Sequence, residues 1–303
     1  MTRVLVVGVA VMDFVFYVED FPSGGTKNRA HDSALVGGGC GANAAVAIAR
    51  LGGDAALASR LGADPLGKMI CEELEAEGVD LSATDRSGAR SSFSSILVDA
   101  RGERQIMNYR GDGLLLSPDH LANTSGFQAV LADTRWPEGA LAAMELARAR
   151  GVPGVLDVEA LSEVDAFGPA SHLAFSEQGL SYHYPDVPAE QAIAQVAKDY
   201  GGWVCVTTGE TGLFWNDGMR AGCVPGYEVE VLDTLGAGDI WHGAFSLGLA
   251  EGQDEIDAAR FANAVAALKC TRLGGRAGSP TLSLIHISEP TRPVGISRMP
   301  SSA

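Results

Sequence analysis

The fold is decided by residues 233–243, which read Asp233-Thr-Leu-Gly-Ala-Gly-Asp-Ile-Trp-His-Gly243. This stretch places a carboxylate on each side of a Gly-Ala-Gly turn. The run before it, residues 228–232, alternates glutamate with valine, which is typical of a strand. Residues 240–249, after it, have the apolar spacing of a buried helix. The sequence therefore predicts a strand, a glycine-rich turn and the start of a helix, in that order.

Such a turn brings backbone N–H groups and the positive end of a helix to one point, which suits a phosphate or a developing anion. Asp239 lies in the first turn of the predicted helix. There its carboxylate can accept a proton from a hydroxyl while the amides stabilise the anion. The alternative is that Asp239 only caps the helix, because capping aspartates are common at such junctions.

The full string Asp-Thr-x-Gly-Ala-Gly-Asp, followed by a helix of small and apolar residues, resembles the C-terminal signature of the ribokinase-like (PfkB) carbohydrate kinases. The resemblance implies an ATP-dependent enzyme that phosphorylates an alcohol group of a sugar. It implies that Asp239 is the catalytic base. It also implies that Gly236, Ala237 and Gly238 form the hole that holds the transferred anion.

The composition is that of an acidic protein with a sizeable core. The chain has 303 residues, 46% of them hydrophobic, which suits one large domain or one domain with a small appendage. The formal net charge of −16 argues against nucleic acid or an anionic membrane as a partner. An acidic protein that binds an anionic substrate must gather its cations locally, and only four lysines are present: Lys27, Lys68, Lys198 and Lys269.

The cysteine pattern and the first residues predict a cytoplasmic protein. The cysteines are odd in number and scattered, without a C-x-x-C pair, so we expect reduced thiols rather than disulfides or a zinc site. Residues 3–7 directly follow the first methionine and are too short and strand-like for a signal peptide. No apolar run in the sequence reaches the length of a transmembrane helix.

Apolar strands alternate with helices along most of the chain. This alternation predicts an α/β fold with a doubly wound, mostly parallel sheet flanked by helices, as the ribokinase-like resemblance also implies. We expect strands at 3–9, 55–60, 129–133, 154–157, 173–175 and 204–207, and helices at 41–51, 65–77, 138–150, 189–200, 237–251 and 254–271.

Two segments break this alternation. Residues 11–34 and 91–111 have strand-like patterns without a helix beside them. They predict a small antiparallel sheet standing off the main domain, or else an extra hairpin at the edge of the main sheet. In the family the matching segments form a β-lid over the sugar and often a dimer contact. We therefore expect a homodimer formed through the exposed lid edges, and an α/β kinase domain made of residues 1–10, 35–90 and 112–281.

The tail, residues 282–303, is atypical. A final amphipathic helix is expected at this place, but Leu-Ser-Leu-Ile-His-Ile-Ser-Glu-Pro-Thr-Arg-Pro has no helical face and leads into a stretch rich in Pro, Ser and Arg. We interpret residues 282–303 as a non-native tail and give them no functional role.

A glycine run before the first helix is a candidate sugar site. Gly37-Gly-Gly-Cys-Gly-Ala-Asn43 lets a ligand approach the backbone, and the asparagine amide offers a donor and an acceptor to hydroxyls. Asp13 comes just after the first strand, where open α/β sheets bind ligands. The alternatives are a tight capped loop and a turn aspartate. The resemblance implies that Asp13, Gly38, Gly39 and Asn43 bind the sugar.

A second loop, Thr207-Thr-Gly-Glu-Thr-Gly212, follows the strand at 204–207. Taken alone, T-G-x-x-G is a weak signal that an ordinary turn explains. Beside the signature, the resemblance implies that Thr208, Gly209 and Gly212 bind ATP. It also implies that Asn263 lines the adenine pocket, against the alternative of a polar residue on a helix flank.

One family motif is altered. Many members carry Asn-x-x-Glu, which helps to order magnesium and phosphate through water, whereas this chain has Ser176-Glu-Gln-Gly179 there. Glu177 is the candidate substitute, and the metal ligands stay unassigned. Mg²⁺ is still expected, because the charge around a transferred phosphoryl group must be neutralised. Binding of K⁺ by carbonyls near Asp233 and Gly274, as in some relatives, is left open.

Two cations and an amide bear on the substrate. Lys27 and Asn108 lie in the two lid segments, and Arg135 follows the strand at 129–133. The planar guanidinium of Arg135 suits sulfonate or phosphate oxygens; the alternative is that both cations are solvated surface charges. With Leu131-Ala-Asp-Thr-Arg-Trp136 and Gly274-Gly-Arg-Ala-Gly278, these residues resemble the bacterial sulfofructose kinases.

That resemblance implies phosphorylation of the C1 hydroxyl of 6-deoxy-6-sulfofructose, giving 6-deoxy-6-sulfofructose 1-phosphate in sulfoquinovose catabolism. The alternatives are kinases of fructose, a fructose phosphate, ribose or 2-keto-3-deoxygluconate, since a neutral sugar does not need the two cations. A catalytically silent sugar- or nucleotide-binding regulator is the alternative of another class, and the intact signature argues against it.

Overall fold

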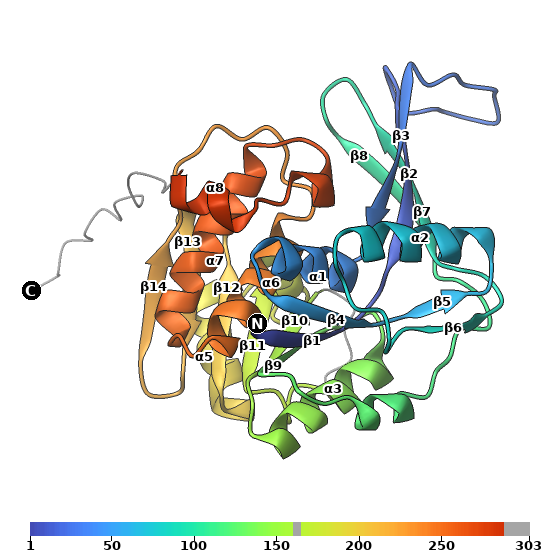
Figure 1. Cartoon of the computed structure of the whole chain (residues 1–303). Helices are drawn as coiled ribbons and strands as arrows, with labels where there is room; N and C mark the ends of the chain where they lie inside the picture. The colour runs from blue at the N-terminus through green and yellow to red at the C-terminus, as the bar shows by residue number, and fades with distance from the viewer. Residues whose placement is uncertain (160–164, 288–303) are drawn as a thin grey trace, which may run out of the picture.

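The computed structural model describes residues 1–159 and 165–287, and a central sheet runs through it (Figure 1). Its strands are β1 (Arg3–Val7), β4 (Asp54–Ala58), β9 (Ala129–Asp133), β10 (Gly154–Val158), β11 (His172–Ser176), β12 (Trp203–Thr207), β13 (Gly212–Asn216) and β14 (Ala221–Pro225). They lie in the order β14-β13-β12-β11-β10-β9-β1-β4. All neighbours from β12 to β4 are parallel, and β13 and β14 add an antiparallel edge. The expected doubly wound, mostly parallel sheet is confirmed.

Helices cover both faces of this sheet. One apolar core joins it to α1 (Cys40–Arg50), α2 (Pro65–Ala76), α6 (Ala237–Ala250) and α7 (Glu255–Cys270). The core of the opposite face joins it to α3 (Pro137–Arg150), α4 (Glu177–His183) and α5 (Ala189–Tyr200). Three short 3-10 helices, η1 (Asp119–Asn123), η2 (Gly209–Thr211) and η3 (Gly275–Gly278), lie in connections.

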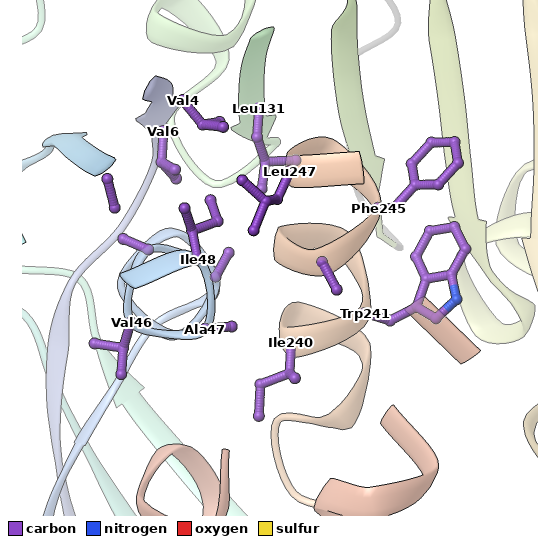
Figure 2. Packing of buried hydrophobic residues seen from close by; sticks show 14 of the residues in the cluster. Val4, Val6, Val46, Ala47, Ile48, Leu131, Ile240, Trp241, Phe245 and Leu247 are labelled. Atoms are coloured by element: carbon purple, nitrogen blue, oxygen red, sulfur yellow. The ribbon is translucent and has the colours of Figure 1, made fainter. Parts of the chain in front are cut away.

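Close packing of α1 against α6 fixes the signature helix (Figure 2). Small residues permit it: a Cβ at Gly243 would lie 2.6 Å from the carbonyl oxygen of Ala44. Beside this contact, Trp241 and Phe245 stack with ring centroids 4.9 Å apart. Burial of each such aromatic side chain contributes about 1.5–3 kcal/mol, so the start of α6 is held rigidly against the sheet.

A second sheet stands off the main layer (Figure 1). Its strands β2 (Val11–Tyr17), β3 (Asp32–Gly38), β7 (Phe93–Val98) and β8 (Arg104–Tyr109) lie in the order β3-β2-β7-β8. The expected small separate sheet is confirmed; its outer pairings are antiparallel and its central pairing, β2 with β7, is parallel. Strands β5 (Arg60–Gly62) and β6 (Asp85–Gly88) pair with each other and form a third, two-stranded sheet. The edge strand β8 exposes Met107 to 75%, and dimerisation through the lid edges stays a prediction.

Two local predictions are wrong. Residues 228–232 are not a strand: they have no neighbour in the sheet, and the amides of Leu232 and Asp233 instead donate to the carbonyl oxygen of Cys270, at 2.8 and 3.1 Å. Leu282–Ile287, expected to lack a helical face, forms the short helix α8 against α7. The rest of the tail prediction, residues 288–303, lies outside the described residues.

The predictions on thiols and membranes concern the same described part of the chain. All five cysteines are free. Within residues 1–159 and 165–287, none of the helices combines the length and the apolar character needed to cross a bilayer.

One buried carboxylate joins three segments of the chain. Asp133, at the end of β9 and 2% exposed, accepts N–H groups of Val9 (2.8 Å) and Gly41 (2.9 Å) on Oδ2 and that of Arg135 (3.0 Å) on Oδ1. Burial raises the pKa of Asp133 to about 6, although these N–H groups favour its charged form. The end of β1, the start of α1 and the loop after β9 are thereby held together.

We expect Asp133→Ala to lower the free energy of unfolding by about 2–4 kcal/mol, because each buried N–H left without an acceptor costs about 1–3 kcal/mol. Urea denaturation measures it. Asp217→Ala is the matched control, since Asp217 also accepts two backbone N–H groups, from Met219 and Arg220, but at a solvent-facing turn where water replaces it. Equal losses in the two variants would contradict the role of burial.

Candidate active site

A cavity of about 670 Å³ lies between the end of the main sheet and the second sheet. Ala10 after β1, Arg135 after β9 and Glu159 after β10 line one side of it. The chain order of the sheet reverses between β1 and β9, and open α/β sheets bind ligands outside the carboxyl ends of strands at such a point. The volume is that of a typical small-molecule site.

Asp239 lies in the wall of this cavity, in the first turn of α6. The side-chain amide of Asn43 donates to its Oδ2 at 2.7 Å. Desolvation raises the pKa of Asp239 to about 6; the Asn43 hydrogen bond opposes this rise, and the charges of Glu159 and Asp133 add to it. Above that pH the carboxylate is ionised and more basic than an ordinary aspartate, as general-base catalysis requires.

The signature turn presents part of the predicted anion hole. Gly236 and Gly238 line the cavity. The N–H of Ala237 donates to the carbonyl oxygen of Thr234 at 3.1 Å, and Ala237 does not line the cavity. Two of the three predicted positions are therefore placed to meet an anion, at the N-terminus of a fourteen-residue helix.

The glycine run shapes the opposite wall. A Cβ at Gly38 would collide with the carboxylate of Asp13, and one at Gly39, whose φ is +96°, would collide with the backbone of Val9. Gly38, Gly39, Asn43 and Asp13 all line the cavity. The structure thus brings together the four residues that the sequence predicts to bind the sugar. Because Gly38 has no side chain, there is room for the carboxylate of Asp13.

A row of polar side chains crosses the second sheet and roofs the cavity. Asp13 on β2, Ser94 on β7 and Asn108 on β8 are in register, and all three line the cavity. Asn108 Nδ2 donates to Ser94 Oγ at 2.9 Å. Burial raises the pKa of Asp13, and the hydrogen bond with Ser94 and the charge of Arg276 oppose the rise.

Acidic and thiol groups cluster below Asp239. The ligand atoms of Cys40, Asp157 and Asp239 lie within 4.8 Å of one another. Burial, followed by the charges of Glu159 and Asp239, raises the pKa of Asp157 well above its usual value. His242, with Nε2 3.5 Å from Asp157 Oδ1, is buried, which lowers its pKa to about 4 and keeps it neutral. These carboxylates are oxygen donors of the kind that Mg²⁺ prefers.

The two predicted cations are not placed alike. Arg135 lines the cavity and forms an ion pair with Glu159. Lys27 lies in the exposed connection between β2 and β3 and is not part of the cavity wall. Arg60 and Arg110 line the cavity although the sequence did not single them out.

The predicted nucleotide residues follow the next strands along the same edge of the sheet, outside the cavity. Thr208 comes after β12, and its amide and hydroxyl donate to the carbonyl oxygen of Gly212 at 2.8 and 3.2 Å. Gly209 begins η2. Asn263 is 7% exposed; it accepts from Trp241 Nε1 at 2.8 Å and donates to the carbonyl oxygens of Val224 and Pro225. Its amide therefore fixes α6 to α7 and β14.

The altered Asn-x-x-Glu segment forms the start of α4. Ser176 caps the helix by accepting the N–H of Gly179 at 3.0 Å, and Glu177 is exposed. A Cβ at Gly179 would lie 2.5 Å from the carbonyl oxygen of Val158. This backbone leaves no room for a glutamate at 179. Glu159, the residue after Val158 in the chain, lines the cavity.

A family model described as pfkB family carbohydrate kinase matches residues 1–282. The chain belongs to the pfkB family of carbohydrate kinases. The ribokinase of Bacillus subtilis is 28% identical over 288 residues, covering 93% of this chain and 97% of that protein. Fructokinase-1 of Zea mays is 29% identical over 277 residues, covering 80% and 85%. The expected enzyme class, an ATP-dependent carbohydrate kinase, is confirmed.

Solved structures agree with the fold of this pfkB-family kinase. A putative ribokinase from Agrobacterium tumefaciens superposes with a TM-score of 0.85 at 35% identity, covering 95% of this chain and 97% of that one. The ribokinase of Arabidopsis thaliana, solved with ribose and ATP, superposes with a TM-score of 0.84 at 25% identity, covering 95% and 98%.

Sequence reasoning missed several residues of this kinase's cavity: Cys40, Arg60, Ser94, Arg110, Glu159 and Arg276. Glu159 gave a usable signal, because it directly follows the strand at 154–158 and such ends meet at one edge. Ser94 gave a weaker one, since it lies two residues before Ile96 and therefore on the same face of a predicted strand. Arg276 lies within the quoted motif Gly274–Gly278 but received no role. Arg60 and Arg110 gave no signal, because only the folded chain brings them to the cavity.

We expect kcat/KM to rise with pH through about 6 and to level off above it, because the Asp239 carboxylate must be ionised to accept a proton. Asn43→Ala removes a hydrogen bond that lowers the pKa of Asp239. The acidic limb of its pH–rate profile is therefore expected at higher pH than in the wild type. Asn123→Ala, at an exposed position, is the control. An unmoved limb in Asn43→Ala would contradict the assignment of Asp239.

Proposed function

We propose that this kinase transfers the γ-phosphoryl group of ATP to the C1 hydroxyl of 6-deoxy-6-sulfofructose. The observation that carries the proposal is the Asp239 carboxylate, with its pKa raised to about 6, at the start of α6 in a cavity of small-molecule size. A base of this kind beside helix N–H groups suits the attack of a hydroxyl on a phosphoryl group.

In this reaction the sugar hydroxyls are held by Asp13, Asn43 and the backbone at Gly38 and Gly39. Among the described residues, nothing pairs with the buried Oδ1 of Asn43, so this acceptor is left for a hydroxyl. Asp239 takes the proton of the C1 hydroxyl as its oxygen attacks the γ-phosphorus, and the bond to ADP breaks. The N–H groups near Gly236 and Gly238 stabilise the phosphoryl oxygens.

The polar roof and the loops below it exclude water from the reacting atoms. The row from Asp13 to Asn108 covers the sugar, and the two sheets enclose the site. Excluding water limits the hydrolysis of ATP and strengthens electrostatic interactions within the site.

Mg²⁺ and ATP are also part of the proposed reaction. When bound, Mg²⁺ neutralises charge on the transferred phosphoryl group. The carboxylates of Asp157 and Glu159 are oxygen donors suited to hold it, directly or through water, whereas the thiol of Cys40 is a poor ligand for this ion. ATP is expected along the ends of β11 and β12, near Glu177, Thr208, Gly209 and Gly212. Because the side-chain amide of Asn263 is hydrogen-bonded within the protein, the proposal does not place Asn263 at the adenine.

The anionic end of the substrate is supported by the cations of the cavity. In a protein of net charge −16, Arg60, Arg110, Arg135 and Arg276 all line the cavity, and Arg276 is paired with Glu73 at 2.9 Å. Arg60 stacks on Trp136 and donates to the carbonyl oxygen of Leu115, and neither contact neutralises its charge. Arg135 and Asn108 line the same cavity and are proposed to share the sulfonate with it, whereas Lys27 lies outside the cavity.

A neutral sugar is the second candidate. The observation that favours it is the ion pair of Arg135 with Glu159, because a neutralised arginine does not demand an anion. The ribokinases and fructokinases among the relatives suggest ribose or fructose in that case.

We expect Asp239→Asn to lower kcat by about 10²–10⁴-fold, which is typical for loss of a general base, while ATP binding measured by calorimetry is retained. Asp257→Asn, an exposed aspartate in the first turn of the next helix, is the matched control. Near-normal turnover of Asp239→Asn would overturn the mechanism.

Substrate choice is tested by ADP release from Mg-ATP with 6-deoxy-6-sulfofructose, fructose 6-phosphate, fructose and ribose. We expect selective turnover of the sulfonate. Arg135→Gln should then raise KM for the sulfonate more than for fructose, because only the sulfonate loses a charge-assisted hydrogen bond. Arg150→Gln, at the exposed end of α3, is the control. Preferred turnover of a neutral sugar would select the second candidate.

A further inference from the structure

A buried lysine lies behind the signature turn. Lys269, in the last turn of α7, is 0% exposed. Its Nζ lies 2.7 Å from the carbonyl oxygen of Asp233, 3.2 Å from Oδ2 of the same residue and 3.5 Å from the carbonyl oxygen of Arg272. Lysine is almost never fully buried without partners, and here the partners are three oxygens of the signature loop and the segment after α7.

This shell is the kind that a monovalent metal ion takes. Backbone carbonyl oxygens replace the hydration shell of K⁺ in proteins, and a carboxylate oxygen supplies the counter-charge. An ammonium group carries the same single positive charge and binds the same oxygens. The ammonium of Lys269 thus fills, from within the chain, a place suited to a potassium ion.

Two of the three oxygens that Lys269 binds belong to Asp233, the residue that orders the signature. The Asp233 carboxylate accepts N–H groups of Leu235 (2.9 Å), Gly274 (3.0 Å) and Gly275 (3.1 Å). Arg104 of the second sheet also binds it, at 3.1 Å. Asp233 therefore connects the start of the signature to the loop that begins η3, and Gly236 and Gly275 both face the cavity.

A second side-chain cation, that of Arg50, binds the far end of the same loop. Arg50 Nη1 donates to the carbonyl oxygens of Arg276, Ala277 and Ser279, at 3.3, 2.9 and 2.9 Å. Its Nε and Nη2 bind Glu77 at 2.8 and 2.6 Å. The carbonyl groups around η3 are thus satisfied by side-chain cations of the chain itself.

We propose that the Lys269 ammonium is a built-in monovalent cation that orders the anion-hole loop, so that this enzyme needs no potassium. The proposal rests on the proposed kinase function and makes Lys269 a positioning residue: it acts on the Gly236–Gly238 turn through Asp233 and touches no substrate. In this proposal no K⁺ binds the carbonyl groups near Asp233 and Gly274.

The first test uses the wild-type enzyme. ADP release is measured with Mg-ATP and the best sugar of the panel, in choline chloride and in potassium chloride of equal ionic strength. The expected result is the same rate in both salts. A rate that rises and saturates with potassium would overturn the proposal. Because turnover itself is measured, the absence of turnover in both salts would reject the proposed sugar substrates rather than the role of Lys269.

The second test asks whether potassium can replace the side chain. Lys269→Ala leaves space and three oxygens without a partner, and we expect kcat in choline to fall by about 10- to 100-fold, the effect of leaving buried polar groups unpaired. Potassium or methylammonium should restore part of the rate. Lys269→Met fills the same space with an apolar chain and should not respond. Lys198→Met, in the last turn of α5 but exposed, is the matched control.

Thermal unfolding gives a readout independent of activity. The Tm of Lys269→Ala should rise on exchanging choline for potassium, while the Tm of the wild type and of Lys269→Met should not. A Lys269→Ala enzyme that matches the wild type in choline, in both rate and Tm, would overturn the proposal. If the alanine variant does not fold, the wild-type salt comparison decides.

Discussion

The carboxylate of Asp133 is the contact on which the rest of the site depends. It binds the amides of Val9, Gly41 and Arg135, which belong to three different segments of the chain. Those segments supply the wall of the cavity after β1, the start of the helix that carries Asn43, and the arginine after β9. A buried acceptor with three backbone donors has one good geometry, because any displacement leaves an N–H without a partner. The buried Asp133 carboxylate therefore holds these three segments at fixed distances from one another.

Desolvation also raises the pKa of Asp239, the predicted base. Several carboxylates come together at the cavity. Burial, and after it the negative charge of neighbouring carboxylates, raises the pKa of Asp157 and of Asp239. Asp239 gains a pKa of about 6 from this arrangement, and Asn43 limits the rise. The cost of gathering negative charge is offset by fixed partners: helix N–H groups, arginines of the cavity wall and, behind the signature, the ammonium of Lys269. Individual partners within the site compensate these charges, although the protein as a whole has a net charge of −16.

Much of the fold could be predicted from periodicity. The strands at 129–133 and the helix at 189–200 have the expected bounds, because buried parallel strands and amphipathic helices leave strong patterns. The run at 228–232 misled because alternation of valine and glutamate indicates a strand only where a neighbouring strand is available. The residues predicted to bind the sugar meet in one cavity, because β2 with Asp13 and the end of β3 with Gly38 lie beside the start of α1, where Gly39 and Asn43 stand. Lys27 does not join them, and Asn263 proved to be a structural amide, because exposure and hydrogen-bond partners cannot be read from spacing.

The sequence by itself determined the family and the α/β sheet, because the signature and the strand–helix alternation are local patterns. It also predicts Asp239 as the base. Only the tertiary structure decided how charge is shared. It paired Arg135 with Glu159, packed the Val158 carbonyl against Gly179 so that no side chain fits there, and buried Lys269 against Asp233. These are contacts between residues distant in the sequence, and their strength depends on burial, which arises only when the chain has folded.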